Sequence, residues 1–82
     1  MDAEIERWLR EWFSTRGAPG ATEASPTVDY FEAKWIDSLA VIELIEAAEN
    51  EFSINFKEDN FMDRRFSSLA GLTQIISELR RD

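Results

Sequence analysis

The stretch 37–52, DSLAVIELIEAAENEF, decides the fold of this 82-residue chain. Its apolar residues recur at helical spacing and predict a helix over about 38–52. The face expected to be buried consists of Val41, Leu44, Ile45, Ala48 and Phe52. Asp37 is a good N-cap, because its carboxylate can accept the free N–H groups of the first turn. Ser38 is then the first helical residue.

The opposite face of this predicted helix is acidic and partly apolar. It carries Leu39, Ile42, Glu43, Glu46 and Glu49, and the window 35–56 contains no Lys or Arg. Like charges at this spacing destabilise a helix by about 0.2–0.5 kcal/mol per pair. This face therefore predicts a docking surface for a basic, partly apolar partner. The alternative is a solvated helix face with two incidental aliphatic side chains.

Working outward from this helix, the remaining pattern predicts a small all-α four-helix bundle, with three main helices and one short helix. An apolar stripe predicts a first helix over about 2–16, made by Ile5, Trp8, Leu9, Trp12 and Phe13. A second stripe predicts a last helix over about 67–80, made by Leu69, Leu72, Ile75, Ile76 and Leu79. A Gly- and Pro-containing loop over 17–37 and a short helix over about 58–63 complete a single domain, 1–82.

Composition excludes several classes of function. The chain has no Cys and no His, so we expect no disulfide, no metal site and no catalytic residues. Its net charge of −8 argues against binding to nucleic acid or to anionic membranes. No apolar run approaches a membrane span, and the start of the chain is acidic, unlike a signal peptide. We expect a cytoplasmic, monomeric, non-catalytic protein.

The hydroxyl of Ser38 is a candidate for covalent modification. A helix N-terminus favours negative charge through its dipole and its free N–H groups, so a phosphodiester on Ser38 would be tolerated there. The alternative is that Ser38 only shares the capping of the helix with Asp37.

Residues 28–79 resemble an acyl carrier protein or a peptidyl carrier domain. The resemblance centres on Asp37-Ser38-Leu39 and continues through the acidic helix to its Glu-Phe ending. It extends to Phe52-Ser53-Ile54-Asn55-Phe56 and to Phe66-Ser67-Ser68-Leu69. The long loop between the first two helices is also typical of this family.

The resemblance implies that Ser38 carries 4′-phosphopantetheine, transferred from coenzyme A by a phosphopantetheinyl transferase with Mg²⁺. Asp37 would help at that interface. The thiol of the arm would hold an acyl or aminoacyl group as a thioester for loading enzymes, acyltransferases or synthases. The resemblance further implies a recognition face made by Leu39, Ile42, Glu43, Glu46 and Glu49, with Phe56 flanking the arm or its cargo.

Two residues depart from the pattern of fatty-acid carriers. Trp35 stands where the family often has glycine, and Glu46 stands where fatty-acid carriers often place an apolar contact residue. They favour a free-standing carrier of polyketide, nonribosomal peptide or related antibiotic biosynthesis over a fatty-acid carrier. Outside the family, the alternative is an unmodified helical adaptor whose acidic face binds a basic protein.

Overall fold

The structure is a computed structural model that describes residues 2–81, apart from the side chain of Pro19. Its elements are α1 (Ala3–Thr15), η1 (Pro19–Thr22), α2 (Ala40–Phe52), α3 (Glu58–Met62), η2 (Arg64–Ser67) and α4 (Leu69–Arg81), where η marks a 3₁₀-helix. Within residues 2–81 there is no strand, only an isolated bridge between Asp29 and Ser68. The predicted all-α four-helix fold is confirmed.

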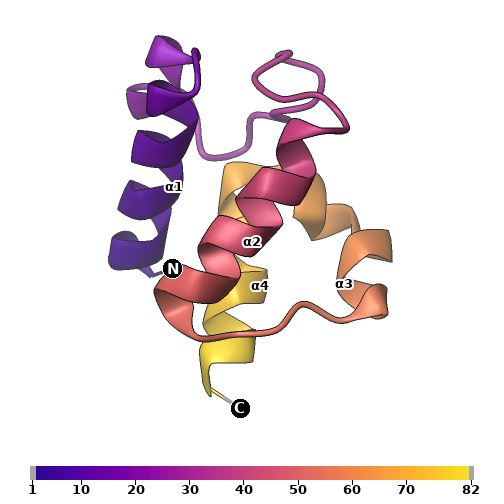
Figure 1. Ribbon diagram of the computed structural model, residues 1–82. Helices are drawn as coiled ribbons and strands as arrows, with labels where there is room; N and C mark the ends of the chain where they lie inside the picture. Colours follow the sequence, from indigo (N-terminus) through magenta and orange to yellow (C-terminus); the bar gives the residue numbers. More distant parts are fainter. Residues whose placement is uncertain (1, 82) are drawn as a thin grey trace.

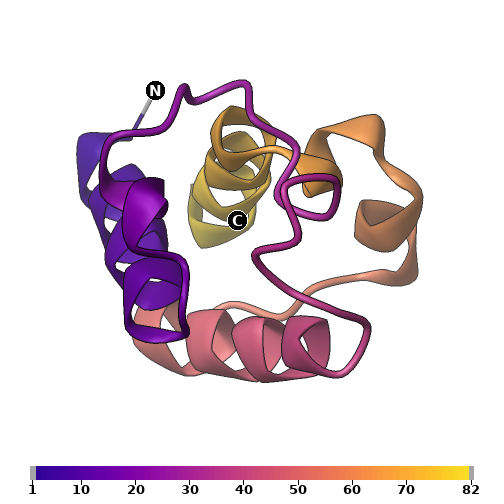
Figure 2. The same ribbon diagram turned by 90° about the horizontal axis from the view of Figure 1, so that it is seen from above.

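The three long helices surround a common core (Figure 1). The end of α1, the connecting loop and the start of α2 lie at one end of the molecule, and the end of α2 lies toward the other. Figure 2 looks nearly along α4, with α1 on one side of it and α3 on the other. The start of α2 is therefore placed by the loop and by the end of α1.

The core is made by the apolar stripes of α1, α2 and α4. Its fully buried aliphatic side chains are Ile5, Leu9, Leu44, Leu69, Leu72, Ile75 and Ile76. Burial of such a side chain contributes about 1.5–3 kcal/mol. Trp8, Val41, Ile45 and Leu79, which were expected in the stripes, are partly buried and pack against this core.

Helix α1 begins and ends through local hydrogen bonds. The Asp2 carboxylate accepts N–H bonds from Glu4 and Ile5 at 3.0 and 3.2 Å, which makes Asp2 the N-cap. At the other end, Gly17 has a φ of +99°, and the following N–H of Ala18 donates to the carbonyl of Phe13. A left-handed residue after a helix is most often glycine, because other residues meet steric strain there.

The second half of the long loop is fixed to the turn before α4. Tyr30 is fully buried, and its hydroxyl donates to the carbonyl of Phe66. The backbone N–H of Tyr30 donates to Ser67 at 3.1 Å, and the carbonyl of Pro26 accepts from Ala70 at 2.8 Å. This segment therefore packs irregularly against the core.

The first half of the loop is held by one arginine of α1. The Arg10 guanidinium donates to the carbonyls of Ala21 and Ala24, at 3.0 and 2.6 Å. It is oriented by an ion pair with Glu6, one helical turn earlier. The position of this Gly- and Pro-containing stretch therefore depends on a residue distant in the sequence.

The region between α2 and α4 differs in detail from the expectation. Helix α3 ends at Met62, because Asp63 is extended and caps η2 by accepting from the N–H of Arg65. The 3₁₀-helix η2 was not predicted, and α4 begins at Leu69 rather than near Ser67. The residues between α2 and α3 form an extended linker instead of a strand.

Gly71 allows η2 and α4 to approach closely. A Cβ at this position would overlap with the carbonyl group of Arg65 and lie 2.6 Å from its Cα. The obstacle is backbone, which cannot rotate away as a flexible side chain would. The close packing of η2 on α4 therefore depends on glycine at position 71.

Candidate functional site

The start of α2 is capped by Asp37. Its Oδ1 accepts the N–H groups of Leu39 and Ala40 at 3.1 and 2.8 Å, and its carbonyl accepts from Val41. Leu39 already has helical dihedral angles, φ −80° and ψ −43°. By its hydrogen bonds Asp37 is therefore the N-cap, and Ser38 occupies the first helical position, as the sequence predicts.

The hydroxyl of Ser38 is exposed and makes no hydrogen bond to any residue in the range 2–81. Three other serine hydroxyls within residues 2–81 have structural partners. Ser25 bonds to Thr27, Ser67 donates to the carbonyl of Arg64, and Ser68 accepts from the N–H of Gly71. Ser38 does not share in the capping of α2, so its hydroxyl is free to react.

The surface that follows Ser38 on α2 is exposed and apolar at two positions. Leu39 is 71% exposed and Ile42 is 53% exposed, and Glu46 is exposed as well. Exposed aliphatic side chains beside acidic ones do not contribute to the core, and they suit contact with a partner. The geometry matches the predicted recognition face at these positions, while their role in partner binding stays a prediction.

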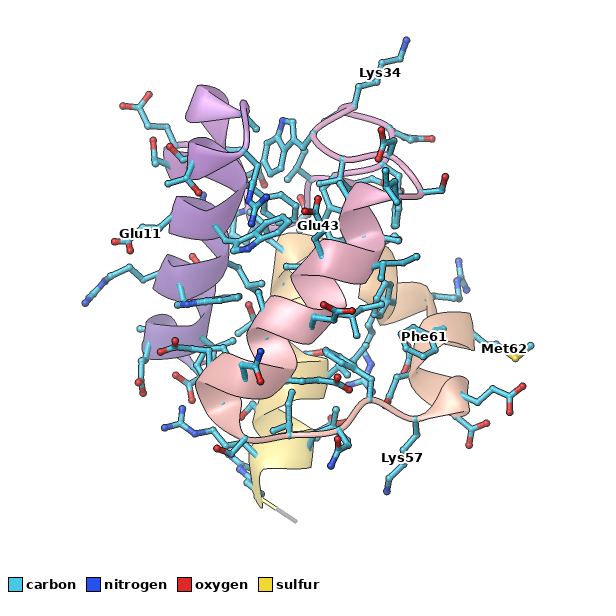
Figure 3. All side chains as sticks on the ribbon, in the orientation of Figure 1. Glu11, Lys34, Glu43, Lys57, Phe61 and Met62 are labelled. Atoms are coloured by element: carbon cyan, nitrogen blue, oxygen red, sulfur yellow. The ribbon has the colours of Figure 1, made fainter. Side chains whose placement is uncertain are left out.

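Two glutamates of that face have partners within the chain. Glu43 pairs with Arg16, from the end of α1, at 3.4 Å (Figure 3), although both side chains are about half exposed. Glu49 is partly buried, and its Oε2 accepts the N–H of Phe56 at 2.9 Å. Although the window 35–56 contains no Lys or Arg, the acidic face has a positive charge nearby, because the end of α1 supplies Arg16.

Sequence reasoning missed two exposed apolar residues on α3. Phe61 is 45% exposed and Met62 is 81% exposed, and Figure 3 shows them at the side of the molecule formed by α3. The Phe61 ring lies 6.0 Å from that of Phe56, which also packs against Phe66. The signal in the sequence was two large apolar residues in succession within the expected short helix 58–63. In the structure this helix buries none of its residues.

An open depression of about 410 Å³ lies beside Asp37. Its lining combines two cationic residues, Arg16 and Lys34, with the aromatic residues Phe31 and Trp35. Asp37 and Ala40, from the start of α2, form one side of it. A basic and aromatic recess next to Ser38 was not expected from the acidic composition of the chain.

The titratable groups with shifted pKa values lie outside this site. Hydrogen bonds from Arg65 lower the pKa of Asp63 and that of Glu78 below their usual range. Burial is the main cause of the raised pKa of Tyr30, and the negative charge of Asp29 raises it further. These groups join η2, α4 and the loop, which indicates a structural role for them.

Residues 2–81 show neither a metal-binding cluster nor a membrane-spanning helix. Among the residues described, no group of three or more Asp and Glu side chains could hold a metal ion. Each helix within 2–81 is too short or too polar to cross a membrane.

Comparison with known proteins gave one match. The family described as "Phosphopantetheine attachment site" matches residues 16–76. No curated protein and no solved structure matches the chain. Members of this family carry 4′-phosphopantetheine in covalent linkage. The match spans well over half of the chain and includes the whole of α2, and the chain therefore belongs to the phosphopantetheine-attachment family of carrier domains.

Proposed function

We propose that Ser38 is the attachment site of 4′-phosphopantetheine and that the chain carries acyl or aminoacyl groups as thioesters. The free, exposed hydroxyl at the start of α2 carries this proposal. Within the matched residues, only Ser53 is comparably exposed and without a side-chain partner among the residues described. Ser53 follows the end of α2, where the helix dipole disfavours an anion, whereas Ser38 lies at the end that favours one.

The chain's own contribution to attachment is to present one nucleophile in a fixed position. The Ser38 oxygen bonds to the phosphorus of coenzyme A that bears the pantetheine, the pyrophosphate bond breaks, and the adenosine bisphosphate leaves. The proton of the hydroxyl goes to a base of the transferase, since the chain contains no His or Cys. Once attached, the arm supplies a terminal thiol that holds the cargo.

The absence of cysteine supports this function. The thiol of the arm would be the sole thiol on the protein, so no neighbouring thiol of the chain could capture the cargo by exchange. Tethering also raises the concentration of the cargo at each partner enzyme. Trp35 and Glu46 favour a specialised pathway, such as polyketide or nonribosomal peptide assembly, over fatty-acid synthesis.

The decisive experiment is intact mass spectrometry after incubation with coenzyme A, Mg²⁺ and a broad-specificity phosphopantetheinyl transferase. We expect the wild-type chain to gain the mass of one phosphopantetheine and one titratable thiol. Ser38→Ala should gain neither, whereas Ser53→Ala should behave as wild type. Circular dichroism controls for the fold of both variants. Unchanged wild-type mass beside a modified control carrier would favour the unmodified adaptor, and a gain retained by Ser38→Ala would place the arm elsewhere.

We also propose that Leu39, Ile42 and Glu46 guide the transferase and later partners to Ser38. Glu46 is the sharper probe than Glu43, because Glu43 pairs with Arg16. In the same assay, Glu46→Lys should lower kcat/KM several-fold, since interface charges mainly set the association rate. Glu11→Lys is the matched control, because Glu11 is exposed on α1 and points away from α2 (Figure 3). Equal rates for the two variants would remove Glu46 from the recognition face.

A further inference from the structure

We propose that the proximal part of the arm docks in the depression beside Asp37, with Lys34 facing its phosphodiester and Trp35 facing the apolar carbons that follow. The inference rests on the proposed function of Ser38. The arm begins with an anion, and the next carbons bear a geminal dimethyl group. The depression offers cations and aromatic rings in the same small space, and its lining includes Asp37, the residue before the point of attachment.

The start of α2 cannot by itself neutralise the phosphodiester. The N–H groups of Leu39 and Ala40 are already bound to the Asp37 carboxylate, and that of Val41 is bound to the Asp37 carbonyl. The Asp37 carboxylate adds a negative charge of its own beside the new one. A nearby cation would offset this negative charge, and two cations, Arg16 and Lys34, line the depression.

Lys34 is the cation that is free to do so. Its side chain makes no ion pair or hydrogen bond within residues 2–81, and it extends from the loop into solvent (Figure 3). Arg16 is engaged, because it pairs with Glu43 at 3.4 Å and lies over the ring of Trp12 at 4.9 Å. A lysine on a flexible stem can turn toward the phosphodiester without breaking another contact.

The backbone at Lys34 supports a role for its side chain. Lys34 has a φ of +61° and ends the turn that begins at Tyr30, where the N–H of Trp35 donates to the carbonyl of Tyr30. Glycine is the residue that fits this helix-ending position with least strain. The chain nevertheless has a cation there, at the rim of the depression.

Trp35 offers a fixed apolar wall. Its ring packs against Phe13, a fully buried residue of α1, at 5.4 Å between centroids, and Trp35 itself stays partly exposed. Phe31, which is 38% exposed, lines the same recess. The volume of about 410 Å³ falls within the range of roughly 300–1,000 Å³ found for small-molecule sites.

The test compares the bare and the modified protein by NMR, with modification verified on the same sample by intact mass. The three tryptophans give separate indole N–H signals. Attachment should shift the Trp35 signal and give contacts between the arm's methyl protons and the Trp35 ring. The Trp8 signal should not move, because Trp8 packs against Phe52 at the other end of α2 and serves as an internal reference.

Charge variants then test whether the Lys34 side chain contributes to the docking. In the modified protein, Lys34→Gln should reduce the Trp35 shift by half or more, and Lys34→Arg should restore it. Lys57→Gln is the matched control, because Lys57 is exposed in the linker before α3, far from Lys34 in Figure 3. It should leave the shift unchanged. Raising the salt concentration should act like Lys34→Gln, since the contact is exposed and screened.

The outcomes separate the two proposals. A complete mass gain with an unmoved Trp35 signal and no methyl contacts would overturn the docking and leave Ser38 as the attachment site. A shift unaffected by Lys34→Gln would overturn the role of Lys34. Failure of the mass gain would overturn the proposed function, and the docking with it.

Discussion

The two ends of α2 each present a serine with an exposed hydroxyl, yet they differ in almost everything that surrounds it. Before Ser38 the chain is capped by the side chain of Asp37, and the positive end of the helix dipole faces the hydroxyl. Ser53 has left-handed dihedral angles, φ 54° and ψ 48°, at the negative end of the same dipole. The comparison teaches that exposure alone does not make a serine an anion site, because the local field decides between the two.

The two ends are also held in place differently. The start of α2 follows a loop that is fixed to η2 and α4 through Tyr30. The hydrogen bonds at the end of α2 are close in sequence, with Glu49 accepting the N–H of Phe56 through its side chain and that of Ile54 through its carbonyl. Disturbing η2 should therefore loosen the Ser38 end more than the Ser53 end.

The largest expected effect comes from Gly71→Ala. The added Cβ would overlap with the backbone of Arg65, so η2 or α4 must move. Overpacking of this kind costs about 1–3 kcal/mol of unfolding free energy. Urea unfolding measures the loss, and hydrogen exchange should show that the amides of Leu39 and Ala40 lose more protection than that of Ile54.

Gly20→Ala is the control for this prediction. A Cβ at Gly20 has no atom within 4 Å, and its φ is not positive. Its stability should stay within about 0.5 kcal/mol of wild type. Equal stability of the Gly71 and Gly20 variants would show that η2 is not tightly packed on α4.

Tyr30 should make the Ser38 end sensitive to alkaline pH. Burial raises the pKa of Tyr30 in the folded protein, so above the unfolded value of about 10 only the unfolded chain loses this proton. The stability from the neutral hydroxyl is complete below pH ~10 and falls above it, by up to about 1.4 kcal/mol per pH unit. Because the chain has one Tyr, tyrosinate absorbance reports this ionisation directly.

Tyr30→Phe is the matched variant. It loses the hydrogen bond to the carbonyl of Phe66, which should lower the free energy of unfolding by about 1–2 kcal/mol at neutral pH. Its stability should then approach that of wild type as the pH rises above 10, because Phe has no proton to lose. A constant difference across this range would mean that the Tyr30 hydroxyl ionises freely in the folded protein.

The elements that the sequence predicted best are those whose signals are local. The stripes of α1 and α4 and the cap at Asp37 depend on residues within a few positions of one another, and the structure has them close to the expected bounds. Periodicity and capping residues are sufficient for such features. They left open whether Ser38 shares in the cap, and in the structure its hydroxyl is free.

What the sequence did not predict depends on pairs far apart in the chain. Arg16 reaches Glu43 across 27 positions, and Tyr30 reaches Phe66 across 36. The depression beside Asp37 arises from how the loop folds back on the bundle. No local pattern encodes these contacts, because each partner alone resembles an ordinary surface or core residue.

A smaller effect is expected from the cap itself. Asp37→Ala leaves the N–H groups of Leu39 and Ala40 without their acceptor, which should lower the free energy of unfolding by about 1 kcal/mol. Asp37→Asn keeps an acceptor oxygen and should be nearly as stable as wild type. If Asp37 also contacts the transferase through its charge, Asp37→Asn will slow phosphopantetheine transfer while thermal stability is retained. Equal transfer rates for wild type and Asp37→Asn would limit Asp37 to capping.

The smallest effect should come from Ser53→Gly at the other end of α2. Glycine adopts the left-handed conformation without strain, which should stabilise the fold, but it also raises the entropy of the unfolded chain. The net gain should be a few tenths of a kcal/mol, up to about 1, measured by urea unfolding. Phosphopantetheine transfer should be unchanged, because this end of the helix takes no part in it. If the variant gained stability but lost phosphopantetheine transfer, the two ends of α2 would not be independent. A partner protein would then also contact the Ser53 end.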